Sequence, residues 1–335
     1  MFAMGQDAEV IGAAFGATSP EAPTLGESIG MMLQNGIFGI GNGVWIIVAI
    51  VVSVIIMALG VSGGIEKACK IMIPLLFALF LIMAVYIATL PGAIDGYKFI
   101  FTLQPERLLD LKLWIYAFGQ AFFSLSVAGN GSVIYGSYLG KDVEISSSAR
   151  NVAIFDTLAA LVAMIVIIPA MATTGSALDT NGPGLMFIAL PGVFNGMGGI
   201  GWVVGAFFFI AVLFAGTTSI INLYETPVAF MQEKLKLGRL PSVIIIHVIG
   251  LVVALLIQPW AAQWMDMVSI YICPFGAALA GIMFFWIMKK KTALDAVNQG
   301  ARKPVGGWFH PFGKFVYVPL CVVALVAGAL LGGIG

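Results

Sequence analysis

Long apolar runs alternate with short polar loops along most of the chain. A run of about 20 apolar residues is long enough to cross the hydrocarbon core of a bilayer as a helix. Residues 1–43 contain no such run, so we expect an extracellular segment there and a transmembrane domain at 44–335. The runs predict eight membrane-spanning helices, at residues 44–61, 71–90, 113–138, 151–174, 198–230, 241–259, 264–288 and 315–333.

The composition agrees with this pattern. Hydrophobic residues make up 60% of the 335 and charged residues only 10%, whereas a soluble domain carries about 25% charged residues. The chain is therefore predicted to be an all-α polytopic membrane protein. Its formal net charge of zero gives no indication of a nucleic-acid partner. The three cysteines are far apart and have neither metal-binding nor redox spacing.

Basic residues are concentrated in alternate loops. Of the 16 Lys and Arg residues, all except Lys98, Arg107 and Lys112 fall in four such loops. The positive-inside rule places these loops in the cytoplasm, which predicts a multi-pass protein of the plasma (inner) membrane with residues 1–43 and the C-terminus outside. An acidic N-terminal segment would then start outside with no preceding helix to deliver it. We therefore expect that an upstream part of the protein is missing.

The third predicted helix cannot be regular throughout. The segment Trp114–Tyr138 is apolar enough to span, yet its middle is rich in helix-weakening residues. A break at membrane depth is tolerated only beside protein or a water-filled cavity. The carbonyl end of one half suits a cation, and the N–H end of the other suits an anion. A sodium and carboxylate site is one reading, and close helix packing is the other. The residues concerned are Ser124, Ser126, Gly129, Asn130, Gly131 and Ser132.

A second polar constellation lies in the run 198–230. Ala215, Thr218 and Ser219 have the spacing of one helix face, and Asn222 extends that face by a turn. A backbone carbonyl with two hydroxyl groups is a hard-oxygen set suited to Na⁺. The alternative is that both hydroxyl groups bond back to their own helix, as Ser and Thr commonly do in membrane helices.

Three carboxylates lie in or near the predicted spans. An ionisable residue inside a span is a functional hypothesis by default, and Asp156 fits it unless the cytoplasmic helix end is near enough to solvate it. Glu225 lies beside a basic run and is expected to be structural, while Asp266 could cap the start of its helix.

His247 and His310 have no partners at metal-ligand spacing. No hydrolase, Walker or zinc-protease motif occurs, so no enzyme is predicted.

Five segments resemble the neurotransmitter:sodium symporter family and occur in that family's order. The resemblance covers the chain from about residue 44 onward. It implies the inverted-repeat fold of the leucine transporter, with the eight helices here corresponding to its fourth to eleventh and the first three absent. In the family the first helix is also broken and contributes to the ion and substrate sites. The segments are residues 64–77, 90–101, 114–139, 182–194 and 214–227.

The resemblance assigns roles to residues around the break. Phe123 matches the aromatic lid over the substrate, and Ser126 matches a substrate contact in the unwound segment. Ser124 matches a first-sodium-site ligand that also borders the substrate, and Asp156 matches another ligand of that ion. Gly129 replaces a bulky aromatic of the leucine transporter, which implies a wider pocket.

Further positions match on the later helices. Ala215, Thr218 and Ser219 match the second sodium site, and Ser219 also borders the substrate. Leu223 matches a pocket-wall residue. Asp266 resembles the acid of the outer gate, whose arginine partner would lie on an absent helix.

These matches imply a sodium-coupled symporter of amino acids or related small amines that works by alternating access. Its coupling ion would be Na⁺, with no organic cofactor. Chloride would not be required, because Ala160 occupies a position that is polar in chloride-dependent members. The partners would be an amino acid, the lipid bilayer and the missing N-terminal helices. Two alternatives stay open: a non-transporting fragment or partner-requiring subunit, and a proton- or other cation-coupled carrier on the same fold.

Overall fold

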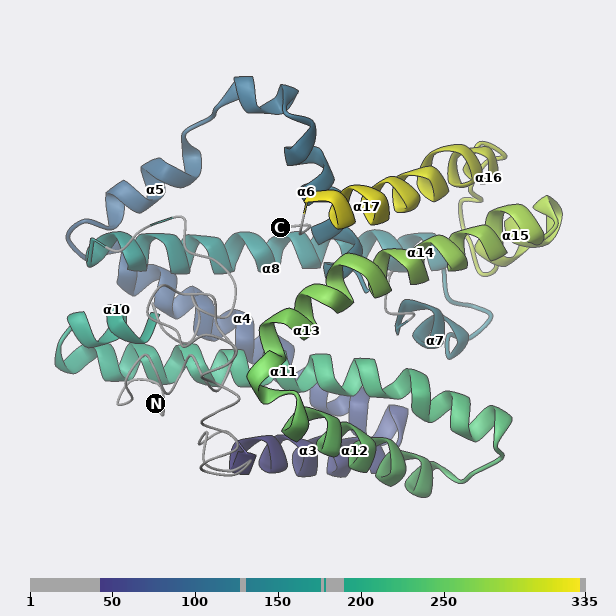
Figure 1. Ribbon diagram of the computed structural model, residues 1–335, viewed down its shortest axis with the longest axis horizontal. Coiled ribbons are helices and arrows are strands. Elements are labelled where there is room, and N and C mark those ends of the chain that lie inside the picture. Colours follow the sequence, from purple (N-terminus) through teal and green to yellow (C-terminus); the bar gives the residue numbers. More distant parts are fainter. Residues whose placement is uncertain (1–42, 127–130, 176–177, 179–189, 332–335) are drawn as a thin grey trace. The chain divides into compact units, whose positions relative to one another are not determined.

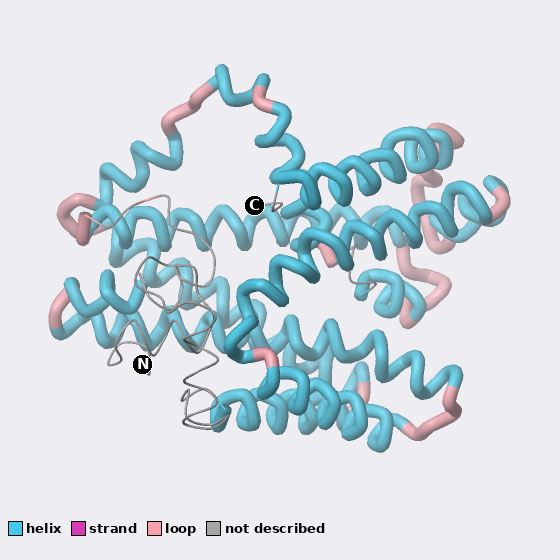
Figure 2. The backbone as a smooth tube through the Cα atoms, viewed as in Figure 1, coloured by secondary structure: helices cyan, strands magenta, loops and turns pink. Residues whose placement is uncertain are grey.

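A computed structural model describes residues 43–126, 131–175, 178 and 190–331. Every regular element in these ranges is a helix (Figure 2), as the sequence predicted. The chain divides into two compact units, which are described separately. Unit 1 comprises the described parts of Met1–Thr102 and Ala159–Trp264, and unit 2 comprises those of Leu103–Leu158 and Met265–Gly335.

The apolar runs form helices of membrane-spanning length. Within the described ranges, six helices are long and apolar enough to cross a bilayer: Val61–Ala88, Ile145–Thr173, Gly199–Lys234, Arg239–Leu256, Gln263–Ile287 and Phe309–Leu330. A shorter apolar helix occupies Ile46–Ala58, and the predicted broken helix forms two pieces. These elements account for the eight predicted segments, and the protein is a membrane protein.

Unit 1 is built around the long helix α11 (Gly199–Lys234). A π-helical turn at Val61–Ile65 precedes α4, and a 3₁₀ turn at Gln258–Trp260 precedes α13. The other helices are α3 (Gly43–Ala58), α4 (Glu66–Ala88), α5 (Ala93–Phe101), the second half of α8 (Ile145–Thr173), α10 (Leu190–Gly196), α12 (Arg239–Leu256) and the start of α13 (Ala261–Met267).

The core of unit 1 joins α4, α8, α10 and α11. Met83, Met171, Phe194 and Phe208 are buried there, with the Phe194 and Phe208 rings 5.5 Å apart. α5 packs so closely on α8 that a Cβ atom on Gly96 would lie 2.5 Å from the Pro169 backbone. A larger residue at this position would therefore separate the two helices.

Unit 2 contains the broken helix and the C-terminal helices. α6 (Leu111–Ser124) follows a 3₁₀ turn at Pro105–Leu109, and α7 (Gly131–Ser137) precedes the first half of α8. π-helical segments at Val268–Ile272 and Met283–Ile287 flank α14, and another at Gly313–Tyr317 leads into α17. The remaining helices are α14 (Cys273–Ile282), α15 (Lys290–Val297), α16 (Phe309–Phe312) and α17 (Val318–Leu331).

Small side chains form the core of unit 2. Phe122 of α6 packs against Cys273 and Ala277 of α14 and against Cys321 of α17. Both cysteines are reduced and buried, so they serve as small apolar packing residues. Because these residues are small, α14 and α17 can approach closely.

His247 is fixed by hydrogen bonds at both ring nitrogens. Nδ1 lies 2.7 Å from the Val243 carbonyl oxygen, and Nε2 lies 2.9 Å from the Ser53 hydroxyl oxygen on α3. A carbonyl can only accept, so Nδ1 carries a proton and donates to Val243. The Tyr224 ring packs edge-on at 4.6 Å. These contacts give His247 a structural role between α3 and α12.

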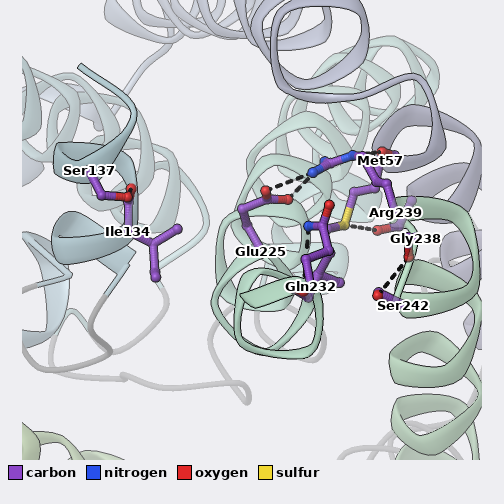
Figure 3. A network of polar contacts seen from close by, with 10 residues as sticks. Met57, Ile134, Ser137, Glu225, Gln232, Gly238, Arg239 and Ser242 are labelled. Carbon is purple, nitrogen blue, oxygen red and sulfur yellow. Dashed lines mark hydrogen bonds and ion pairs between the residues drawn. The ribbon is translucent and has the colours of Figure 1, made fainter. Parts of the chain in front are cut away.

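Glu225 is held by a charged clamp (Figure 3). Its carboxylate is fully buried, and Arg239 at the start of α12 donates to both oxygens at 2.9 Å. The same guanidinium donates through Nε to the Met57 carbonyl oxygen, 2.9 Å away near the end of α3. Such a two-pronged contact is among the stronger ion pairs in proteins. The clamp therefore joins α3, α11 and α12 at one end of unit 1.

Arg239→Ala is expected to lower the free energy of unfolding by about 3–5 kcal/mol, because it leaves a buried carboxylate without its cation. Thermal unfolding in detergent micelles measures the loss. Lys98→Ala is the matched control: it removes a cation 3.0 Å from Asp95 in an exposed pair, which is worth about 1 kcal/mol or less. Equal losses for the two variants would contradict the clamp.

Candidate ion and substrate site

The broken helix is interrupted where the sequence predicted. α6 ends at Ser124 and α7 begins at Gly131 (Figure 1). Ser126 has a φ of +52°, a left-handed conformation that is uncommon for a residue with a side chain. Strained backbone of this kind is concentrated at functional sites. Gly129, the predicted cause of a wider pocket, lies outside the described residues.

Ser132 connects the two halves of the break. Its hydroxyl oxygen lies 3.1 Å from the Leu125 carbonyl oxygen and 3.4 Å from that of Ser126. The hydroxyl of α7 therefore donates to a carbonyl just beyond the end of α6. From the sequence, Ser132 is expected only to weaken the helix. Its place one residue inside the second half of the break is the signal that could identify this role.

Ser124 and Asp156 meet beside the break. The Ser124 hydroxyl on α6 donates to the Asp156 Oδ1 atom on α8 at 2.6 Å. This length is typical of a hydroxyl bound to a carboxylate. α8 begins at Ile145, so Asp156 lies about 16 Å along the helix axis from its first residue.

Three oxygens gather on one face of α11. The Ala215 carbonyl oxygen accepts from the Thr218 hydroxyl at 2.9 Å and from the Ser219 hydroxyl at 3.0 Å. Thr218 can turn instead to the Phe214 carbonyl at 3.1 Å. These are the bonds back to the same helix that the alternative reading expected. They also bring three hard-oxygen ligands together on a face that is partly or fully exposed.

The remaining predicted pocket residues also present accessible side chains. Phe123 on α6 is 48% exposed, and Leu223 on α11 is 57% exposed. The Asn222 amide donates to the Thr218 carbonyl oxygen at 2.9 Å and so braces the polar face of α11. Ser124 and Asp156 belong to unit 2, and the α11 residues belong to unit 1.

Asp266 lies farther into its helix than the sequence suggested. α13 begins at Ala261, so Asp266 is the sixth residue of this helix rather than its opening residue. The effect of a helix dipole falls off within the first turn, and capping no longer explains this carboxylate. Its side chain lies outside the described part of the structure.

The ligands available for an ion are oxygens. Among the described residues, no three His, Cys, Asp or Glu side chains gather as a metal-binding group. Carboxylate, hydroxyl and carbonyl oxygens suit a hard cation such as an alkali-metal ion rather than a soft transition metal.

The chain is similar to proteins from distant organisms. It is 28% identical over 295 residues to a sodium-dependent transporter, itself uncharacterized, of Methanocaldococcus jannaschii, a match that covers 84% of this chain. It is 30% identical over 300 residues to a counterpart in Bacillus subtilis, which covers 83% of this chain. The chain spans 59% and 64% of the lengths of these two relatives.

A solved structure shares the fold. The crystal structure of MhsT in complex with L-phenylalanine superposes with a TM-score of 0.73 at 27% sequence identity. The match covers 95% of this chain and 74% of that one. In addition, the profile of the Sodium:neurotransmitter symporter family matches residues 25–331. The chain belongs to the sodium:neurotransmitter symporter family.

Proposed function

We propose that this chain forms most of a sodium-coupled symporter of amino acids or related small amines. The hydrogen bond between Ser124 and Asp156 beside the broken helix carries the proposal. It brings a carboxylate and a hydroxyl together beside the end of α6. Family membership supports the choice of Na⁺ as the coupling ion.

The first ion would bind to oxygens already close together. Asp156 would supply a carboxylate oxygen and Ser124 a hydroxyl lone pair, and the hydroxyl would turn its hydrogen away so that the ion could lie between the two oxygens. The second ion would bind at Ala215, Thr218 and Ser219, where both hydroxyl groups could turn their protons away from the shared carbonyl. Neither rearrangement requires the helices to unfold.

An amino acid is the substrate class that best fits the surrounding residues. In this proposal Phe123 covers the substrate, Ser124, Ser126 and Ser219 contact its polar groups, and Leu223 forms part of the pocket wall. Gly129 leaves room for a larger side chain. The L-phenylalanine bound by MhsT, a protein with this fold, supports an amino acid as the substrate. Asp266 would be the acid of the outer gate.

Transport would proceed by alternating access, in which one helix group rocks around a site near the bilayer midplane. The sodium gradient would drive it, with about 2.3 kcal/mol per charge for each 100 mV of membrane potential. The protein would lie in the plasma (inner) membrane with its basic loops in the cytoplasm. Chloride would not be needed, because Ala160 offers no ligand and Asp156 provides the negative charge near the first ion.

Uptake of radiolabelled amino acids into proteoliposomes tests this function. Uptake should follow an inward sodium gradient, should stop when choline replaces Na⁺ and should persist when gluconate replaces chloride. Uptake that is unchanged in choline would favour the proton- or other cation-coupled carrier. Sodium binding without uptake would favour a fragment or subunit that requires a partner for the remaining helices.

In Asp156→Ala, the sodium concentration needed to stabilise the chain against heat is expected to rise by at least about tenfold. This is the scale of losing one contact to a charged group. Asp156→Asn should lose less, because its amide oxygen can still bind the ion. Thr157→Ala is the control, since that hydroxyl bonds only to the Ala153 carbonyl of its own helix. Sodium stabilisation that survives unchanged in Asp156→Ala would remove the first-ion assignment.

Thr218→Ala combined with Ser219→Ala should leave the chain folded but reduce its stabilisation by sodium. An ion present at a concentration of about 100 times its dissociation constant stabilises a folded protein by about 2.7 kcal/mol. The part of the sodium stabilisation that is due to this site would be lost. Thr217→Ala serves as the neighbouring control, because its hydroxyl bonds to the Leu213 carbonyl on a buried face. An equal response to sodium in the double variant and the control would rule out the α11 site.

A further inference from the structure

The connection between the last two spanning helices is held at the membrane surface. It joins the spans Gln263–Ile287 and Phe309–Leu330, so both of its ends are anchored at the same face of the bilayer. It contains α15, which buries Ala293 completely and contacts α16. We refer to residues 288–314 as the basic connector.

The basic connector carries a strong positive charge. Its one acidic side chain is Asp295, which is exposed. The salt bridges found within the described ranges all involve other residues. The six basic side chains, of which all but the last are exposed, are Lys289, Lys290, Lys291, Arg302, Lys303 and Lys314.

A closed loop carries two of these charges. The Asn298 side chain accepts from the Val305 backbone N–H at 2.6 Å and donates to the Val305 carbonyl at 3.2 Å. At Gly300 the φ is +68°, and a Cβ atom there would lie 2.5 Å from the Val143 carbonyl oxygen. The loop that carries Arg302 and Lys303 is therefore closed by a paired amide and rests on the neighbouring segment.

Aromatic residues place the charges at the level of lipid headgroups. The Lys314 ammonium lies 4.2 Å from the centre of the Trp286 ring. Trp286, Trp308 and Phe312 are each more than half exposed at the ends of the two spans. Tryptophan is enriched where the hydrocarbon meets the headgroup region. We therefore expect the Lys314 ammonium, next to the Trp286 ring, at the level of the lipid phosphate groups.

We propose that the basic connector binds the headgroup of an anionic phospholipid of the phosphatidylglycerol class. A cluster of basic residues next to a spanning helix is attractive to anionic lipid, and here the Asn298 loop holds the backbone that carries two of the charges. The segment under the loop adds Lys141, Asp142 and Glu144, whose charges leave the region positive. The proposal does not depend on transport.

Binding of dioleoyl-phosphatidylglycerol to the detergent-purified chain, followed by native mass spectrometry, tests this site. Dioleoyl-phosphatidylcholine is the neutral comparison. Arg302→Gln combined with Lys303→Gln should weaken phosphatidylglycerol binding about 30-fold. Each basic residue near a membrane surface contributes about 1 kcal/mol of attraction, and the loss of two such residues corresponds to this change. Binding by the unchanged chain should fall as salt is raised.

Lys234→Gln combined with Lys236→Gln is the matched control, because it removes two basic residues from another loop on the same side. It should leave phosphatidylglycerol binding within about twofold of the unchanged chain, because the proposal assigns no headgroup contact to either residue. If the loop variant does not fold, Lys290→Gln with Lys291→Gln on the exposed side of α15 replaces it. Equal weakening in both pairs, or equal binding of the two lipids, would overturn the proposal.

Discussion

Backbone groups inside a bilayer have no water to bind, and this constraint governs the broken helix. A spanning helix satisfies its own N–H and C=O groups, and any interruption must find partners for those it frees. α6 ends at Ser124, and the Ser132 hydroxyl of α7 donates to the Leu125 carbonyl just beyond that end. The protein itself thus supplies a partner for a carbonyl that the end of α6 frees.

Two carboxylates inside the spans illustrate how a partner decides a role. Glu225 is fully buried and held on both oxygens by Arg239, so its charge is neutralised by a fixed cation. Asp156 instead accepts a hydrogen bond from the Ser124 hydroxyl beside the break, and the residue that it meets there carries no charge. The first arrangement suits a structural clamp. The second suits a site that a mobile cation can enter and leave.

Much of the fold could be predicted because hydropathy reports directly on membrane spans. The break was also predictable, since glycine, serine and asparagine gathered in one apolar run. Short helices such as α5, α10 and α15 were not, because their segments are too short and polar for a clear apolar period. The start of α13 was misplaced by three residues, which put Asp266 at a helix opening that it does not occupy. Contacts between distant segments, such as Ser124 with Asp156, needed the structure or a family resemblance, because sequence spacing alone does not place α6 against α8.

Hydrogen exchange at the break tests the central claim most directly. If sodium binds to oxygens at the interruption, it should stabilise the end of α6 and the start of α7 and slow amide exchange in residues 120–126 and 131–134. The slowing should be about tenfold or more where local opening requires release of the ion. Replacing choline with Na⁺ should leave exchange in α14 nearly unchanged, because α14 supplies none of the proposed ligands. Equal exchange at the break in the two ions, or protection spread evenly over the chain, would contradict the account.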